Sequence, residues 1–204
     1  WVITYLAFTC AGAVIVPFDI LLKSDELASI MRASEARIVF TSAEYLEKVT
    51  RAGAAAGTVK TIALFDAAAA ATAPAGSWTT TTFAAVLEKG RVERAAGRDS
   101  YAAAAVAPDS LAALIFTSGT TGVPKGVMLS HRNLVENGDG VQQSTKLGPG
   151  DNWIIVLPFH HTYPTAMGIF VPLLTGGMIT SVPSMKTNVL VSIIKAAFDT
   201  SYEP

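Results

Sequence analysis

The stretch "FTSGTTGVPKG" occupies residues 116–126, directly behind the apolar run "LAALIF" at residues 111–116. Its three glycines carry no side chains and let backbone N–H groups approach an anion. Its four hydroxyl residues are further donors, and Lys125 adds the positive charge that commonly pairs with a phosphate. The composition leaves two interpretations open: a Gly/Ser/Thr surface turn, or a loop that holds a polyphosphate.

Two familiar phosphate-binding loops do not fit the spacing of this stretch. A Walker A loop requires G-x-x-x-x-G-K-[ST], whereas Lys125 follows Pro124 and precedes Gly126. A dinucleotide-binding loop requires G-x-G-x-x-G at the start of a helix, and residues 116–126 lack that spacing. A phosphate-binding loop here would therefore belong to another type.

Strand and helix patterns alternate along the chain. Apolar, β-branched runs indicate strands at residues 12–18, 37–41, 60–65, 111–116, 126–130, 152–158 and 177–182. Helical patterns fall at residues 24–35, 42–53, 80–90, 131–144, 163–176 and 187–199, with Ser24, Ser42 and Ser130 as predicted N-caps. This alternation predicts an α/β fold with a largely parallel sheet flanked by helices, and ligands outside the carboxyl ends of its strands. The alanine-rich residues 66–108 are expected to form a loosely constrained segment on the surface.

The composition argues against several classes of protein. The 204 residues carry 15 basic and 16 acidic side chains, so no basic excess indicates a nucleic-acid partner. Cys10 is the single cysteine, which excludes a disulfide within the chain and suits a reducing compartment. Its apolar neighbours predict a buried structural residue. The apolar run at residues 166–180 is too short, and too interrupted by proline and glycine, for a membrane-spanning helix.

Four segments together resemble a known family, in the order in which the family has them. "TSGTTGVPKG" resembles the signature loop of the adenylate-forming superfamily, which comprises acyl-CoA synthetases, firefly luciferases and peptide-synthetase adenylation domains. "FTCAGAVIVPFD" and "KGVMLSHRNL" are similar to the family segments before and after that loop. "LPFHHTY" followed by "PLLTGGMIT" resembles the acyl-CoA synthetase branch. The resemblance implies that residues 1–204 are a partial N-terminal AMP-binding domain, without the C-terminal subdomain.

The resemblance also implies a role for the loop residues. In the family this loop binds the β- and γ-phosphates of ATP and then the departing pyrophosphate. The corresponding residues here are Thr117, Ser118, Gly119, Thr120, Thr121, Gly122 and Lys125. The first threonine of the family loop lies near Mg²⁺, which implies the same for Thr117. The implied cofactors are ATP and Mg²⁺, with coenzyme A as a substrate.

The histidines differ in what their positions indicate. His131 follows Ser130 at a helix start, which favours a surface or capping role. His160 and His161 follow an apolar strand pattern on the expected ligand side of the sheet. The fatty-acid branch of the family uses a histidine and an aromatic neighbour to line or gate the acyl pocket, which implies His161 and Tyr163. A purely structural role for this pair stays open. The sequence shows neither a Cys/His cluster with metal-ligand spacing nor a nucleophile triad.

The implied activity is that of a fatty-acid–CoA ligase, which forms an acyl-adenylate from a fatty acid and ATP and then an acyl-CoA. Its partners would be these small molecules, and a homodimer is left open. A peptide-synthetase adenylation domain and a non-catalytic nucleotide- or acyl-binding module are the alternatives. Between Asn152 and Glu203 the only acidic residue is Asp199, which argues against an amino-acid substrate.

The family's remaining motifs are absent from this sequence: the glutamate linked to Mg²⁺, the ribose-binding aspartate and the lysine of the mobile domain. We therefore expect the chain to be part of a longer enzyme and inactive alone. The expected location is the cytoplasm, and peripheral contact with the inner face of the membrane is left open.

Overall fold

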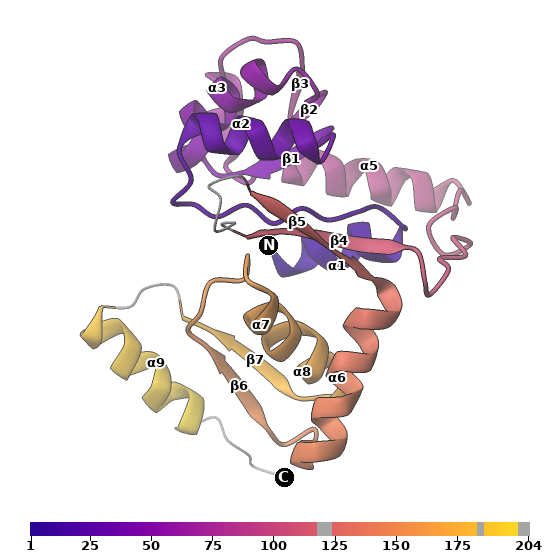
Figure 1. The fold of residues 1–204 in the computed structure, drawn as a ribbon, viewed down its shortest axis with the longest axis vertical. Coiled ribbons are helices and arrows are strands. Elements are labelled where there is room, and N and C mark those ends of the chain that lie inside the picture. The colour runs from indigo at the N-terminus through magenta and orange to yellow at the C-terminus, as the bar shows by residue number, and fades with distance from the viewer. Residues whose placement is uncertain (118–123, 183–185, 200–204) are drawn as a thin grey trace. The chain divides into compact units, whose positions relative to one another are not determined.

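The computed structural model describes residues 1–117, 124–182 and 186–199. The chain forms two compact units, drawn in Figure 1. The first unit comprises Trp1–Pro17, Val106–Ile115 and Val127–Pro204, and the second comprises Phe18–Ala105 and Phe116–Gly126. The predicted α/β class is confirmed, because helices and strands alternate in both units.

The second unit is built on a three-stranded parallel sheet with the order β1-β2-β3. Its strands are β1 (Ile38–Thr41), β2 (Thr61–Leu64) and β3 (Thr79–Thr82). Its helices are α2 (Ser24–Ala33), the 3₁₀ turn η1 (Ala43–Tyr45), α3 (Leu46–Ala56), α4 (Ala67–Ala71) and α5 (Phe83–Ala95). Each parallel step needs a crossover connection, and the helical segments between the strands provide it.

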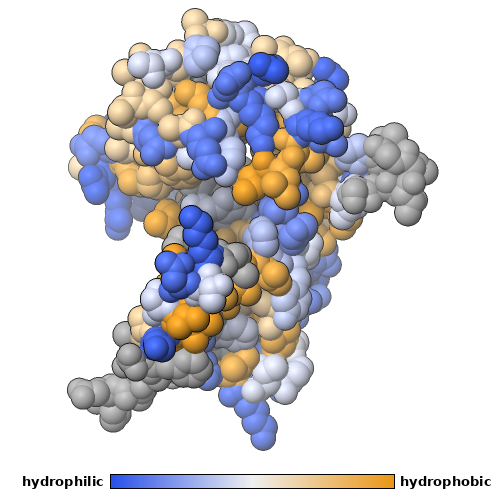
Figure 2. Space-filling view, turned by 90° about the vertical axis from the view of Figure 1, so that its left-hand side faces the viewer, coloured by the Kyte–Doolittle hydropathy of each residue, from blue (hydrophilic) through white to orange (hydrophobic). Residues whose placement is uncertain are grey.

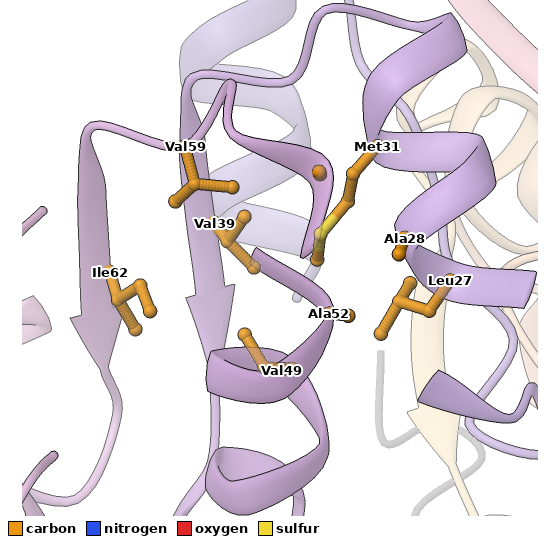
Figure 3. Close-up of a cluster of buried hydrophobic side chains, with 9 residues drawn as sticks. Leu27, Ala28, Met31, Val39, Val49, Ala52, Val59 and Ile62 are labelled. Atoms are coloured by element: carbon orange, nitrogen blue, oxygen red, sulfur yellow. The ribbon is translucent and has the colours of Figure 1, made fainter. Parts of the chain in front are cut away.

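The hydrophobic core of the second unit is formed by side chains from α2, α3, β1, β2 and the residues before β2. Its buried members are Leu27, Ala28, Met31, Val39, Val49, Ala52, Ala56, Val59 and Ile62. Leu27 and Met31 are four residues apart, so they lie one turn apart on the same face of α2. Figure 3 shows these two side chains facing the side chains of the strands. The spacing of Leu27, Ile30 and Met31 in the sequence predicts that they share one helix face, and all three are buried in α2, which confirms that prediction.

Three local predictions for the second unit are wrong. Ser24 is the first residue of α2, and the N-cap is Lys23, whose N–H donates to Oε2 of Glu26 at 2.8 Å. The helix predicted to end near Gly53 runs to Ala56, because Gly57 adopts the left-handed conformation (φ 76°) that ends helices. Residues 66–108 include α4, β3 and α5, so this segment has more regular secondary structure than predicted.

The first unit contains two further pairs of strands. β4 (Leu111–Thr117) pairs with β5 (Lys125–Ser130), and β6 (Asn152–Ile155) pairs in parallel with β7 (Met178–Ser181). The end of β4 and the start of β5 belong to the second unit. The helices are α1 (Val2–Cys10), α6 (His131–Thr145), α7 (Thr162–Thr165), the π-helical turn η2 (Ala166–Phe170), α8 (Val171–Thr175) and α9 (Thr187–Asp199).

Two predictions for the start of the chain are also wrong. Cys10 is exposed, because α1 buries the face that carries Tyr5 and Thr9, and the next residue lies about 100° around the helix. Residues 12–18 form a single bridge, Ile15 to Ala113, instead of a full strand. Pro17 has no N–H to extend such a ladder.

The surface carries many apolar side chains. On the face shown in Figure 2, hydrophobic residues lie among hydrophilic ones. Leu21 is 83% exposed and Met128 on β5 is 70% exposed. Within the described parts of the chain, none of the helices has the length and hydropathy needed to cross a membrane.

Candidate functional site

β4 and β5 form a hairpin whose base lies at the start of α6. The N–H of His131 donates to the carbonyl oxygen of Ser110 at 3.2 Å, which joins the residue after β5 to the residue before β4. Arg132 donates two hydrogen bonds to the carboxylate of Asp109, at 2.6 and 3.1 Å. This hydrogen-bonded cation lowers the pKa of Asp109. β4 therefore leads from this base to the loop, and β5 leads from the loop back to the base.

A capping box fixes the start of α6. The N–H of Asn133 donates to Oγ of Ser130 at 3.1 Å, and the N–H of Ser130 donates to Oδ1 of Asn133 at 3.0 Å. Each side chain thus satisfies a backbone donor that the first helical turn leaves without a partner. Ser130 is confirmed as an N-cap, and His131 contributes its backbone to the hairpin base.

Of the residues predicted to bind phosphate, the structure describes the two at the ends of the hairpin loop, Thr117 and Lys125. β4 buries Ala112, Ala113 and Ile115, whereas its last residue, Thr117, is exposed. Lys125, the first residue of β5, is exposed as well. A hydroxyl and an ammonium group are therefore accessible at the ends of the loop, and both can donate hydrogen bonds to phosphate oxygens. The other predicted loop residues, Ser118, Gly119, Thr120, Thr121 and Gly122, lie outside the described residues.

The two histidines occupy a turn between β6 and α7 in the first unit. The imidazole centroids of His160 and His161 are 4.0 Å apart, with the ring planes inclined by 52°. His161 is the N-cap of α7, and its own N–H donates to the carbonyl of Pro158 at 3.3 Å. His161 is exposed, and Tyr163 is 65% exposed.

An apolar cavity of about 280 Å³ lies beside this turn. Its lining residues are Trp153, Ile154, Ile155, Val156, Leu157, Tyr163, Pro164 and Met167. Tyr163 thus lines the cavity, whereas His161 does not. Trp153 was not predicted to line a site. The sequence of β6 does not alternate polar and apolar residues, so it does not indicate which side chains face a ligand.

The candidate residues fall into two groups. Thr117 and Lys125 belong to the second unit, and His161 and Tyr163 belong to the first. Among residues 1–117, 124–182 and 186–199, no group of three or more His, Cys, Asp or Glu side chains is placed to hold a metal ion.

Comparison with known proteins places these features in a family. The family model described as AMP-binding enzyme matches residues 1–197. Sulfoacetate–CoA ligase of Cupriavidus necator is 46% identical over 72 residues, which are 35% of this chain and 14% of that protein. 4-Coumarate–CoA ligase 1 of Arabidopsis thaliana is 29% identical over 199 residues, which cover 96% of this chain and 34% of that protein.

A solved structure agrees with this fold. The crystal structure of ATP-bound MatB from Rhodopseudomonas palustris is 28% identical and superposes with a TM-score of 0.64. The match covers 95% of this chain and 35% of MatB. The chain therefore spans about a third of the length of MatB and of the Arabidopsis ligase.

Proposed function

Because the chain belongs to the AMP-binding enzyme family, whose adenylate-forming members share its fold, we propose that residues 1–204 form part of an N-terminal AMP-binding domain. The whole enzyme would use ATP to convert a carboxylate into an acyl-adenylate and would then transfer the acyl group to coenzyme A. One observation carries this proposal: the hairpin loop at residues 116–126 combines glycines, hydroxyls and a lysine within a family match that spans residues 1–197.

The proposed role of the loop is to hold the outer phosphates of ATP. Its residues for this role are Thr117, Ser118, Gly119, Thr120, Thr121, Gly122 and Lys125. Negative charge builds up on the pyrophosphate as the carboxylate attacks the α-phosphorus. Fixed donors and an ammonium group stabilise that charge more in the transition state than in the ground state, so they accelerate the reaction. The exposure of Thr117 and Lys125 supports this role.

Magnesium fits the chemistry of one of these donors. Thr117 offers a hydroxyl oxygen, the hard type of ligand that Mg²⁺ prefers, and Mg²⁺ takes few protein ligands when it binds nucleotide phosphates. When bound, the ion would neutralise charge on the phosphates. Thr117 would then both orient a phosphate oxygen and contribute to the metal shell.

The proposed substrate is a fatty acid. The cavity beside the histidine turn is lined by apolar side chains, apart from the indole N–H of Trp153 and the hydroxyl of Tyr163. Such a lining suits an alkyl chain, which gains about 0.8 kcal/mol for each buried methylene. Tyr163 would contact the chain, and His161 would stand at the mouth of the acyl site.

An amino-acid substrate is the second candidate, because peptide-synthetase adenylation domains share the family. The ammonium group of an amino acid requires a compensating negative charge when it is buried. The cavity lining contains no acidic residue, which favours a fatty acid. A module that binds nucleotide or acyl groups without catalysis is the third candidate.

The test is ATP–pyrophosphate exchange by the full-length protein with palmitate, 4-coumarate, sulfoacetate and proline. We expect exchange with palmitate, and at least tenfold slower exchange in Lys125→Ala, since lost transition-state donors cost about 10²–10³-fold in rate. Lys89→Ala is the matched control, because Lys89 is an exposed lysine on α5. Equal rates for Lys125→Ala and Lys89→Ala would refute the role of the loop. Exchange with proline alone would overturn the fatty-acid proposal, and ATP binding without exchange would favour a binding module.

A further inference from the structure

A buried threonine holds the backbone of the histidine turn. Thr165 on α7 is 1% exposed, and its hydroxyl oxygen lies 2.7 Å from the carbonyl oxygen of Phe159 and 2.9 Å from that of His161. The contact with His161 is the usual bond of a helical threonine to the residue four positions earlier. The contact with Phe159 reaches six positions back, beyond the start of the helix. Thr165 therefore ties the turn to the helix that follows it.

The side chain of Phe159 is also held, by packing on two sides. Its ring stacks on Trp1 of the same unit, with centroids 5.3 Å apart and planes inclined by 18°. On another side it meets Gly168, where an added Cβ would lie 3.2 Å from Cε1 of Phe159. The residue before the two histidines is thus anchored through both its ring and its backbone.

The segment that provides these contacts has an uncommon conformation. The π-helical turn η2 begins directly after Thr165 and contains Gly168. Such turns are rare, and they are frequent at functional sites. Gly168 therefore lies on a backbone feature of the kind that accompanies function, and Thr165 is the N-cap residue of that turn.

We propose that Thr165 is a positioning residue, which fixes the backbone of the His160–His161 turn and thereby the proposed acyl site beside it. This inference rests on the proposed function for the identity of the substrate. His161 is exposed and its ring contacts that of His160, its neighbour in the same turn, so the position of both imidazoles follows the backbone of the turn. Losing the Thr165 hydroxyl would loosen the backbone of the turn at Phe159 without changing the imidazole groups, while the Thr165 N–H still donates to the carbonyl of His161 at 3.2 Å.

The first experiment measures hydrogen exchange of the peptide that spans residues 157–163 in the full-length protein. Thr165→Val keeps the side-chain volume and removes the hydroxyl, and we expect about threefold to tenfold faster exchange in this peptide. Thr165→Ser keeps the hydroxyl and should exchange within twofold of the wild type. Should the valine variant not fold, Thr165→Ala also removes the hydroxyl, and Thr175→Ala then serves as its control for the lost methyl group.

A second threonine provides the matched control. Thr175 is 6% exposed, and its hydroxyl contacts the carbonyl oxygens of Val171 and Pro172 at 3.0 and 3.3 Å, all within α8. Thr175→Val makes the same chemical change without touching the turn. Equal exchange of the 157–163 peptide in Thr165→Val and Thr175→Val would overturn the proposal.

The second experiment compares Michaelis constants in the full-length protein. We expect Thr165→Val to raise the KM for the carboxylate about threefold to tenfold and to leave the KM for ATP within twofold. Thr165→Ser should restore the wild-type value. A rise of both constants together, or no rescue by serine, would show a general structural role and would overturn the proposal. If the wild type activates no carboxylate, the proposed function fails, and the exchange experiment still decides whether Thr165 holds the turn.

Discussion

Replacing Gly168 with alanine tests how closely the π-helical turn packs on β6. An added Cβ would lie 2.6 Å from Cδ1 and 2.9 Å from Cγ1 of Ile155, which is buried, so these atoms must move. Overpacking of this kind costs about 1–3 kcal/mol. Exchanging glycine for alanine in a helix gains about 0.5–1 kcal/mol, mainly because the unfolded chain loses freedom. The expected net loss in the free energy of unfolding is therefore about 0–2.5 kcal/mol.

Urea denaturation followed by circular dichroism measures this loss, with Gly140→Ala as the control. Gly140 lies inside α6, and nothing is within 4 Å of an added Cβ there, so the same substitution should stabilise by about 0.5–1 kcal/mol. Ile155→Val removes Cδ1, the nearest atom, and should recover part of the loss in a double-mutant cycle. If Gly168→Ala is as stable as Gly140→Ala, the packing argument is wrong.

Two further predictions concern a buried tyrosine and a helix cap. Burial raises the pKa of Tyr5 to about 12, so spectrophotometric titration should show one tyrosine that stays protonated above pH 11 and disappears in Tyr5→Phe. Because this pKa is raised in the folded state, the free energy of unfolding is unaffected by the ionisation of Tyr5 below pH 10 and falls by roughly 2–3 kcal/mol as the pH rises toward 12. Ionisation of Tyr5 near pH 10 would contradict this prediction. Ser130→Ala should lower the free energy of unfolding by about 1 kcal/mol, and Ser130→Asp should retain it, because an aspartate also caps the helix. Equal denaturation curves for Ser130→Ala and the wild type would show that the capping box does not stabilise α6.

Local signals in the sequence were sufficient for several features. The spacing of apolar residues predicted the buried face of α2, because helical geometry repeats every 3.6 residues whatever surrounds it. Ser130 was recognisable as a cap, since capping depends on residues within one turn of the helix. The composition of residues 116–126 left a surface turn and a phosphate-binding loop both open, and only the resemblance to a family signature loop favoured phosphate binding.

Other features depend on contacts between distant residues, and no local pattern in the sequence indicates them. β3 consists of four threonines without apolar alternation, and its pairing with β2 decides that it is a strand. The exposure of Cys10 depends on which face of α1 the rest of the first unit covers.

The buried face of α2 and the cap of α6 were determined by the sequence itself, because each follows from residues within a few positions of one another. The anchoring of the histidine turn was decided only by the tertiary structure. The ring of Phe159 packs on Trp1, which is 158 positions earlier in the chain, and its carbonyl accepts a hydrogen bond from Thr165 across the start of a helix. Contacts of this kind depend on where the folded chain brings side chains together, which no repeat or spacing in the sequence reveals.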